Sequence, residues 1–448
     1  MVFALLACTV ADSASEVEGA ETGASATIEV TVTQARDTPV HRVQWSTPSA
    51  ASGEVRYGTD GLASVIADDT ESTEHHLWIA GVAAGAEWTL QVVSEADGET
   101  ATSEVITIPA ASAPPWVLAP TLTVPPADEV EGFQLCAKTG PQSGFITMLN
   151  RDGAPVWWAE TLPMASYRAR YDNATATFSW MEAGTEGGEP SFVTSTFDGV
   201  QTRVPAPPTA HHDFAMLEGG GFVTLALDDR ELEGVTVRGE RVVEVAPDGT
   251  NRTLWTSWDT LTWPGDAGKK NEDGTVEWPH ANSMHYDAAA GKILVSLLYV
   301  DSVVQIDRAT ASLDWRFGGE GSDWTIEGES FAGQHGPMSF ADGAGMALLD
   351  NGTPGQVEDA AVARVYDLDP EARTASPRWS FDAGGAHTGV LLGNAEWLAD
   401  DSVVVNWGSA GMISRVDASG DTRWEVAFGL GTYTGFSDHV ADLAGAKR

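Results

Sequence analysis

The sequence predicts an all-β protein, and two observations carry that prediction. Short runs of Val, Ile, Thr and Leu recur between Asp-Gly and Asn-Gly turns, and the 448 residues include 47 glycines and 17 tryptophans. The body of the chain contains neither a long stretch of period 3.6 nor an apolar run of 18 residues. Strands joined by tight turns therefore account for the pattern better than helices do.

The chain begins with a leader-like segment and a small β-rich unit. Residues 1–25 join the apolar stretch MVFALLAC to an acidic tether, and they resemble a bacterial lipoprotein signal in which Cys8 is lipidated. Residues 26–110 hold alternating strands around Trp45, with a Gly81, Gly85 and Trp88 spacing typical of a small fibronectin type III-like or Ig-like β-sandwich. We expect export, a lipid anchor on the bacterial cell envelope, and a buried Cys136.

Residues 111–448 carry a repeat in which an Asp-containing turn precedes a strand, mostly with a tryptophan. The turns lie at Asp152, Asp198, Asp248, Asp307, Asp367 and Asp417. Their separations of 46, 50, 59, 60 and 50 residues match a four-stranded propeller blade whose outer strands form a hairpin. Six turns predict a six-bladed β-propeller, with the tryptophans packed between blades.

The charge excludes several classes of partner. Lys and Arg number 24 against 65 Asp and Glu, giving a net charge of −41. A field of this sign repels nucleic acid and anionic membrane surfaces. We therefore expect a small-molecule partner, no nucleic acid, and membrane contact through the lipid anchor alone.

Histidines recur just before the expected inner strands of four successive blades. They are His211 and His212 in TAHHDF, His280 in WPHANS, His335 in AGQHG and His387 in GGAHTG. Inner strands of a propeller converge on its axis, so these imidazoles are expected to meet. Two chemistries suit such a cluster: a zinc or copper site, or nucleophilic and acid–base catalysis on a tetrahedral anionic group.

The spacing favours the second chemistry. The sequence has no His-x-Glu-x-x-His pattern, and apart from Asp213 no carboxylate is interleaved with the histidines. We therefore expect no metal and no cofactor. His285 falls at an odd offset from His280 and is expected to be structural.

Several strings occur in the order seen in bacterial aryl-sulfate sulfotransferases, and residues 117–440 resemble that family. The strings are HHDF, WPHANSMHYD, ILVS, QIDRAT, WRFGG, QH and LLDNG. The resemblance implies a six-bladed propeller behind a β-sandwich. It also implies transfer of a sulfuryl group from an aryl sulfate to a phenol, without PAPS, through a covalent sulfohistidine.

The resemblance assigns roles to individual residues. It implies that His335 is the nucleophile, that His280 and Asn282 hold the sulfuryl oxygens, and that His212 is the acid–base, with His211 as the alternative. We expect His211, His387 and Gln334 to bind substrate. Gln334 and Asp350 are also candidates for orienting His335.

One departure from the family pattern leaves a second function open. The family follows its HxNS strand with Ser-x-Arg, whereas this chain has Ser296, Leu297 and Leu298. An anion site thereby loses a charge-assisted donor. The pairs Lys269/Lys270 and Arg168/Arg170 either compensate from neighbouring blades or are ordinary solvated charges.

The alternatives to a sulfotransferase are a non-catalytic surface propeller that binds a ligand at its central channel and, less favoured, a metal-dependent hydrolase or lyase.

Overall fold

The computed structural model describes residues 28–96, 98–139, 144–161, 167–182, 189–429 and 431–443. Described residues form strands and short 3-10 turns, which confirms the all-β prediction. The 3-10 turns are η1 (Ser257–Asp259), η2 (Leu298–Val300), η3 (Ala341–Gly343), η4 (Ala383–Gly385) and η5 (Gly408–Ala410). Cys8 and the segment 1–25 lie outside the described residues, so the lipid anchor stays a prediction.

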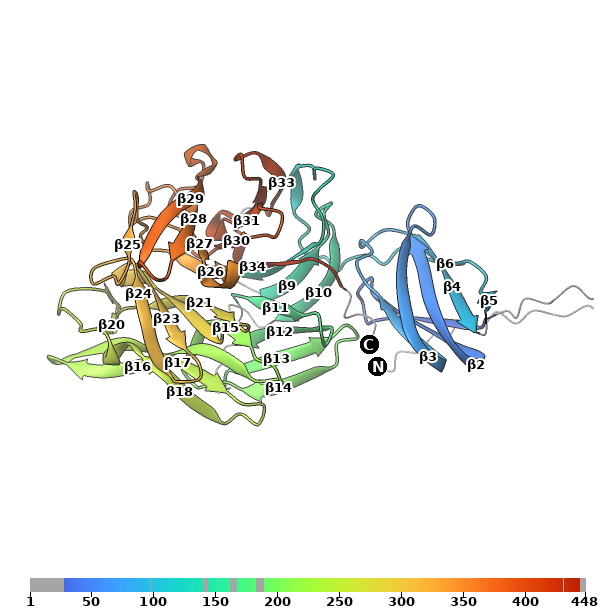
Figure 1. The fold of residues 1–448 in the computed structure, drawn as a ribbon, viewed down its shortest axis with the longest axis horizontal. Coiled ribbons are helices and arrows are strands. Elements are labelled where there is room, and N and C mark those ends of the chain that lie inside the picture. The colour runs from blue at the N-terminus through green and yellow to red at the C-terminus, as the bar shows by residue number, and fades with distance from the viewer. Residues whose placement is uncertain are drawn as a thin grey trace, which may run out of the picture.

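An N-terminal sheet of six strands stands beside the body of the molecule (Figure 1). Its strands are β1 (Val30–Gln34), β2 (His41–Gly58), β3 (Ser64–Ile79), β4 (Trp88–Ala96), β5 (Glu99–Thr102) and β6 (Ile106–Ile108). The long strand β2 pairs with β1, β3 and β4. Alternating residues of these strands bury a core around Trp45 and Trp88, as the period-2 pattern predicts.

Six further sheets each contain four antiparallel strands in one path. The first holds β8 (Phe133–Thr139), β9 (Gly144–Leu149), β10 (Pro155–Thr161) and the C-terminal β34 (Tyr433–Val440); the second holds β11 (Ala169–Asp172), β12 (Thr177–Glu182), β13 (Ser191–Thr196) and β14 (Gln201–Pro205). The third holds β15 (Ala210–Met216), β16 (Phe222–Leu232), β17 (Val235–Val245) and β18 (Asn251–Thr256), with β19 (Lys269–Lys270) and β20 (Val276–Glu277) added beside β17.

The remaining three sheets follow the same plan. The fourth holds β21 (Ala281–Asp287), β22 (Lys292–Leu297), β23 (Ser302–Asp307) and β24 (Ser312–Phe317). The fifth holds β26 (His335–Phe340), β27 (Gly345–Asp350), β28 (Val362–Asp369) and β29 (Thr374–Phe381), with β25 (Thr325–Ile326) on its edge. The sixth holds β30 (Asn394–Trp397), β31 (Val403–Asn406), β32 (Met412–Val416) and β33 (Thr422–Ala427), with β7 (Thr121–Val124) on its edge.

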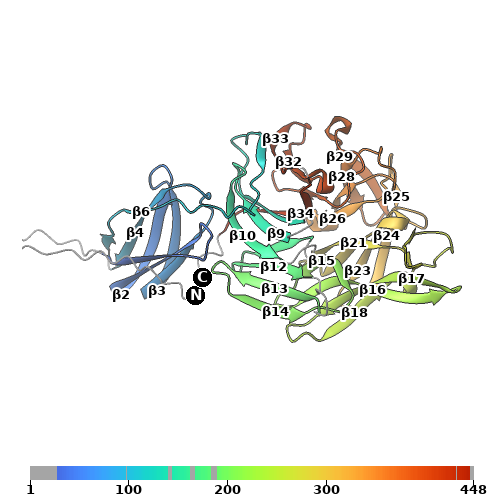
Figure 2. The same ribbon diagram turned by 180° about the vertical axis from the view of Figure 1, so that it is seen from behind.

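Contacts run from each of these six sheets to the next and from the last back to the first. The contacting pairs are β34 with β11, β12 with β15, β15 with β21, β21 with β26, β26 with β30, and β30 with β34. Figures 1 and 2 show β34, β15, β21 and β26 gathered near one centre. The contacting strands of neighbouring sheets therefore lie side by side.

The two ends of the body close this arrangement. Strand β34 pairs with β8, so the C-terminal strand completes the first sheet. Strand β7 pairs with β33, so an early strand covers the edge of the last sheet. Each of these pairings covers a sheet edge that would otherwise expose unpaired backbone groups.

The repeated Asp turns lie between the third and fourth strands, or between β9 and β10 in the first sheet, as predicted. Asp248, Asp307 and Asp417 each accept a hydrogen bond from a backbone N–H within their turn. The first and fifth turns differ. Asn150 accepts the backbone N–H groups of the first turn, and Asp369 those of the fifth, where Asp367 lies within β28. Of the tryptophans after these turns, Trp157, Trp158, Trp255, Trp315 and Trp424 are buried and Trp379 is half-buried.

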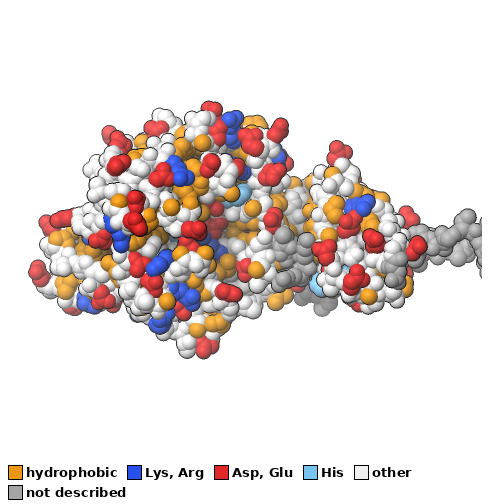
Figure 3. Space-filling model, viewed as in Figure 1, with side chains coloured by type: hydrophobic (Ala, Val, Ile, Leu, Met, Phe, Trp, Pro, Cys, Tyr) orange, Lys and Arg blue, Asp and Glu red, His pale blue; other side chains and the backbone are white. Residues whose placement is uncertain are grey.

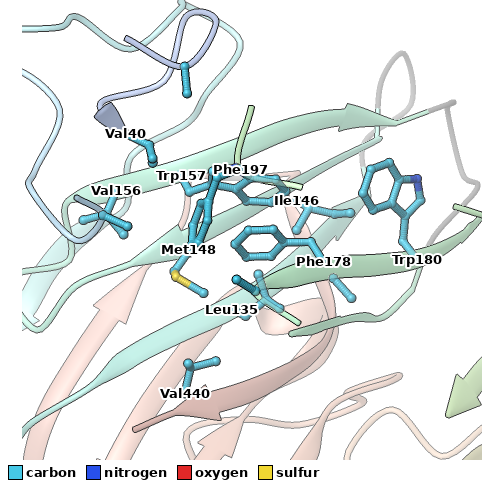
Figure 4. Close-up of a cluster of buried hydrophobic side chains, with 14 of the residues drawn as sticks. Val40, Leu135, Ile146, Met148, Val156, Trp157, Phe178, Trp180, Phe197 and Val440 are labelled. Carbon is cyan, nitrogen blue, oxygen red and sulfur yellow. The ribbon is translucent and has the colours of Figure 1, made fainter. Parts of the chain in front are cut away.

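Apolar side chains join the N-terminal sheet to the first two sheets of the body. Trp157 of β10 stacks on Phe178 of β12, with ring centroids 3.6 Å apart (Figure 4). Val40, from the turn before β2, belongs to the same buried cluster. Cys136 is fully buried in β8, as predicted, and burial raises the pKa of its thiol to about 11.

The surface is densely acidic. Asp and Glu side chains are spread over the visible face of the body and the N-terminal sheet (Figure 3).

Within the described ranges, no helix has the length and apolar character needed to cross a membrane.

Candidate active site

Three inner strands start with a histidine segment and a β-bulge. The pairing register shifts after His211 in β15, after Ala281 in β21 and after His335 in β26. The backbone is left-handed at His212 (φ 59°), His280 (φ 60°) and Gly336 (φ 59°). This conformation costs a residue other than glycine about 1–2 kcal/mol, and bulges next to sites commonly re-aim side chains. The two histidines are thus held in strained, defined orientations.

His211 links a carboxylate to His212. Its Nε2 lies 2.9 Å from Glu240 Oε2, and its Nδ1 lies 2.6 Å from His212 Nδ1. The His212 ring stacks on Tyr167 at 5.4 Å between centroids and meets the His280 ring edge-on at 5.1 Å. Burial, followed by the charges of His211, His280 and His335, lowers the pKa of His212 well below its usual value. His212 is therefore neutral in the unliganded protein.

His280 is held by a different carboxylate. Its Nδ1 lies 3.3 Å from Glu277 Oε2, and its ring meets Tyr299 edge-on at 5.6 Å. Asn271 Nδ2 donates to Glu277 Oε1 over 3.2 Å, which fixes the carboxylate. The hydrogen bond to His280 lowers the pKa of Glu277 to about 2, so this carboxylate is ionised at neutral pH.

The partners of His335 define its tautomer. Its Nδ1 lies 2.8 Å from Asn351 Oδ1 and 3.2 Å from Gly333 O. The Asn351 amide is fixed because its Nδ2 donates to Val390 O and Leu392 O. Both partners of Nδ1 are therefore acceptors, so Nδ1 carries the hydrogen and Nε2 keeps its lone pair. Burial lowers the pKa of His335 to about 4, so its imidazole is neutral at pH 7.

Asn282 and Gln334 support the cluster from inside the core. Asn282 Nδ2 donates to Gln334 O over 2.8 Å, which ties β21 to the residue before His335. The Gln334 side chain is fully buried and donates to Ser296 Oγ, Leu297 O and Ser302 O. Its amide thus points into the core, and the expectation that Gln334 binds substrate or orients His335 is replaced by a structural role.

The charges of His280 and His335 act on His212, and that of His280 acts on His335, whereas His387 contacts other groups. Its ring packs on Trp407 at 4.4 Å, and it lines a cavity with Glu425 and Phe381 between the last two sheets. Asp350 likewise pairs with Arg364, at 2.7 Å, instead of orienting His335. The structure therefore removes His387 from the converging histidines and Asp350 from the candidates for orienting His335.

The arginines proposed as compensating cations are already neutralised. Arg168 is buried, with Nε 3.0 Å from Asp213 Oδ1 and Nη1 2.6 Å from Asp438 Oδ1. Arg170 Nη1 lies 3.1 Å from Asp438 Oδ2. Lys269 and Lys270 form the exposed strand β19. Arg168 and Arg170 are thus neither solvated charges nor spare donors.

The arginine–carboxylate cluster lines a separate cavity of about 180 Å³ with His285 and Glu396. Burial, and next the charge of Asp438, raise the pKa of Glu396 to about 8. His285 lines this cavity from β21 and is not among the contacts of His280. It is therefore outside the histidine cluster, as expected from its odd offset.

Several residues at the site were not identified from the sequence. Asn351 lies in the string LLDNG, and Glu277 lies three residues before His280, so both had a local signal. Glu240, Tyr167 and Tyr299 had none, because only the folded sheets bring them to the histidines. Within the described part of the chain, no three His, Cys, Asp or Glu side chains are grouped to hold a metal ion.

Comparison with known proteins identifies the family. A family model described as arylsulfotransferase (ASST) matches residues 188–427, which is more than half of the chain and includes His211, His212, His280 and His335. The chain belongs to the arylsulfotransferase family. Membership of this family supports a sulfotransferase-type enzyme with small-molecule aryl sulfate and phenol substrates. A search of curated proteins found no match.

Solved structures similar to this arylsulfotransferase-family chain are distant. A protein of unknown function from Bacteroides caccae has a TM-score of 0.43 and 13% identity over 70% of this chain and 100% of its own. A chain of a nidogen/laminin complex has a TM-score of 0.43 and 12% identity over 69% and 98%. A streptogramin B lyase has a TM-score of 0.37 and 12% identity over 70% and 89%.

Proposed function

We propose that this protein transfers a sulfuryl group from an aryl sulfate to a phenol through a sulfohistidine on His335. The observation that carries the proposal is the set of bonds at His335 Nδ1. Asn351 Oδ1 and Gly333 O accept from this nitrogen, so a buried neutral imidazole presents its Nε2 lone pair. Two further imidazoles interact with it electrostatically. The charge of His280 lowers the pKa of His335, and the charge of His335 lowers the pKa of His212.

In the first step, the lone pair of His335 Nε2 attacks sulfur. The N–S bond forms while the bond from sulfur to the aryl oxygen breaks, and the electron pair of that bond leaves with the oxygen. An anionic substrate raises the pKa of nearby imidazoles, so His212 takes up a proton when the aryl sulfate binds. His212 then gives this proton to the departing phenolate.

In the second step, a phenol replaces the first product. His212, now neutral, accepts the hydroxyl proton while the phenol oxygen attacks sulfur, and the N–S electron pair returns to His335 Nε2. The chain from Glu240 through His211 to His212 positions the acid–base group. His280 holds a sulfuryl oxygen. Asn282 was expected to share that role, but it is fully buried and its amide binds Gln334 O and Ser283 Oγ, so it instead positions the segment before His335.

We also propose the finer architecture that this chemistry needs. Six sheets in contact from first to last support a six-bladed propeller, spanning residues 111–448, whose inner strands carry the site. A separate buried core around Trp45 supports an N-terminal β-sandwich of the fibronectin type III-like or Ig-like kind over residues 26–110.

Release of p-nitrophenol from p-nitrophenyl sulfate tests the reaction. Adding phenol should accelerate release and yield phenyl sulfate, because the acceptor discharges the sulfohistidine. His335→Ala should abolish release, and His387→Gln is the matched control that should keep it. A folded wild-type protein that releases no p-nitrophenol would favour the alternative function, a non-catalytic propeller that binds a ligand at its centre.

A further inference from the structure

Sulfuryl transfer requires positive charge close to the transferred group. The sulfuryl oxygens carry negative charge throughout the reaction, and donors fixed in advance are an effective way to stabilise it. This chain has Leu298 where an arginine would follow the HANS segment, and Leu298 N donates to His280 O. Arg168 and Arg170 of the neighbouring strand region are held by Asp213 and Asp438. The cation must therefore come from another side chain.

The pair of Glu277 and His280 has the geometry to supply it. Glu277 Oε2 lies 3.3 Å from His280 Nδ1, and both side chains are about one-fifth exposed, so solvent screens the pair only in part. Glu277 Oε1 is anchored by Asn271 Nδ2. The carboxylate is thus fixed before any substrate arrives, and it favours the protonated form of the imidazole.

Among the described residues, Glu277 is the carboxylate that pairs with His280, and no second one does. Glu240 lies nearby, yet its Oε2 binds His211 and its Oε1 accepts from Ala281 N. The titratable and charged groups around His280 are Glu277 from β20, Lys269 from β19, Glu240 from β17, His211 and His212 from β15, His335 from β26 and Tyr299 from η2. Each carboxylate in this set therefore serves a different histidine.

We propose that Glu277 is a positioning residue that keeps His280 protonated, so that the His280 imidazolium is the cation that holds the sulfuryl group. Glu277 engages Nδ1, and Nε2–H is then the donor directed to a sulfuryl oxygen. Before substrate binds, the proposed site thus contains two neutral imidazoles, His335 and His212, and one charged imidazole, His280. This inference rests on the proposed function for the identity of the anion, whereas the effect of Glu277 on His280 is tested without any substrate.

The test measures the charge on His280 directly. In protein labelled with ¹⁵N-histidine, the His280 pKa is read by NMR titration in the wild type, in Glu277→Gln and in Glu272→Gln. Glu277→Gln keeps an acceptor for Asn271 and removes the charge, so the His280 pKa should fall by about one unit or more. Glu272, exposed on the same loop, is the matched control, and its variant should titrate like the wild type.

Activity supplies the second readout. With p-nitrophenyl sulfate, kcat/KM of Glu277→Gln should fall at least tenfold at pH 8 and less at lower pH, because acid favours the imidazolium that Glu277 no longer stabilises. Adding Leu298→Arg to Glu277→Gln should restore part of the loss and flatten this pH dependence. An unchanged His280 pKa in folded Glu277→Gln would overturn the inference. A lowered pKa in a protein whose wild type shows no turnover would uphold the charge on His280 and overturn the transfer reaction instead.

Discussion

At the scale of single residues, the site is defined by which nitrogen of each histidine is already engaged. His335 offers Nε2 because its Nδ1 donates to Asn351 and Gly333. His211 has both nitrogens engaged, by Glu240 and His212, so it transmits the effect of the carboxylate. The groups beside each imidazole therefore decide which of its nitrogens is free, and this difference underlies the roles proposed for His335 as nucleophile and His211 as relay.

Replacing the amide beside His335 by a carboxylate should change how the reaction depends on pH. Asn351→Asp places an anion at His335 Nδ1, and an anion favours the imidazolium, so the pKa of His335 should rise from its value of about 4. The nucleophile is then protonated over a wider acidic range. Single-turnover rates should fall more at pH 5 than at pH 8, moving the acidic limb of the profile upward. An acidic limb that does not move would show that protonation of His335 does not govern that limb.

At the scale of elements, the β-bulges decide where the histidines point. His335 begins β26, and the following Gly336 is left-handed with almost no room for a side chain. A Cβ at Gly336 would lie 2.3 Å from Asn394 Cβ and 2.9 Å from Asn394 Cα, which are parts of β30 and cannot move freely. The position of the nucleophile thus depends on close contact between two neighbouring sheets.

Gly336→Ala should destabilise the protein and displace His335. The steric overlap adds to the left-handed strain, so we expect a loss of more than about 2 kcal/mol in the free energy of unfolding. Gly343→Ala is the matched control, since Gly343 is also left-handed (φ 84°) but has no atom within 4 Å of its added Cβ. Chemical denaturation of both variants measures the difference. Equal losses of unfolding free energy in Gly336→Ala and Gly343→Ala would contradict a tight contact at Gly336.

At the scale of the whole molecule, strand pairing that closes the sheet edges stabilises the folded state, whereas the surface charge destabilises it. Strands β34 and β7 close the sheets on themselves, so the body is held by pairings between distant parts of the chain. The net charge of −41, spread over the surface (Figure 3), repels itself and opposes the compact state. The balance between these two effects makes stability sensitive to ionic strength.

Salt should therefore stabilise this protein. Between 0.01 M and 1 M NaCl the Debye length falls from about 30 Å to about 3 Å, which removes most repulsion between surface carboxylates. We expect Tm to rise over this range, and most of the rise should be complete once the Debye length is short. Differential scanning calorimetry at several NaCl concentrations provides the measurement, with sucrose as an uncharged control. A flat or falling Tm would mean that repulsion does not limit stability.

The sequence predicted local patterns well and pairings between distant segments poorly. The Asp turns and the convergence of His212, His280 and His335 followed from repeated local signals. His387 differed because η4 and a further loop precede β30, which begins only at Asn394, whereas the other histidines lie at or next to the start of an inner strand. Glu240 reaches His211 only through the pairing of β15, β16 and β17 in one sheet, which no sequence spacing reveals, whereas Glu277 lies three residues before His280 and had a local signal.

The most direct measurement is the intact mass of the protein after brief exposure to p-nitrophenyl sulfate without an acceptor. We expect the wild type to gain the mass of one SO₃ group, with peptide mapping that places it on His335, and to lose it when phenol is added. His335→Ala should gain nothing, and His387→Gln should gain it as the wild type does. Turnover by the wild type without any adduct, or an adduct that persists in His335→Ala, would contradict a sulfohistidine at His335.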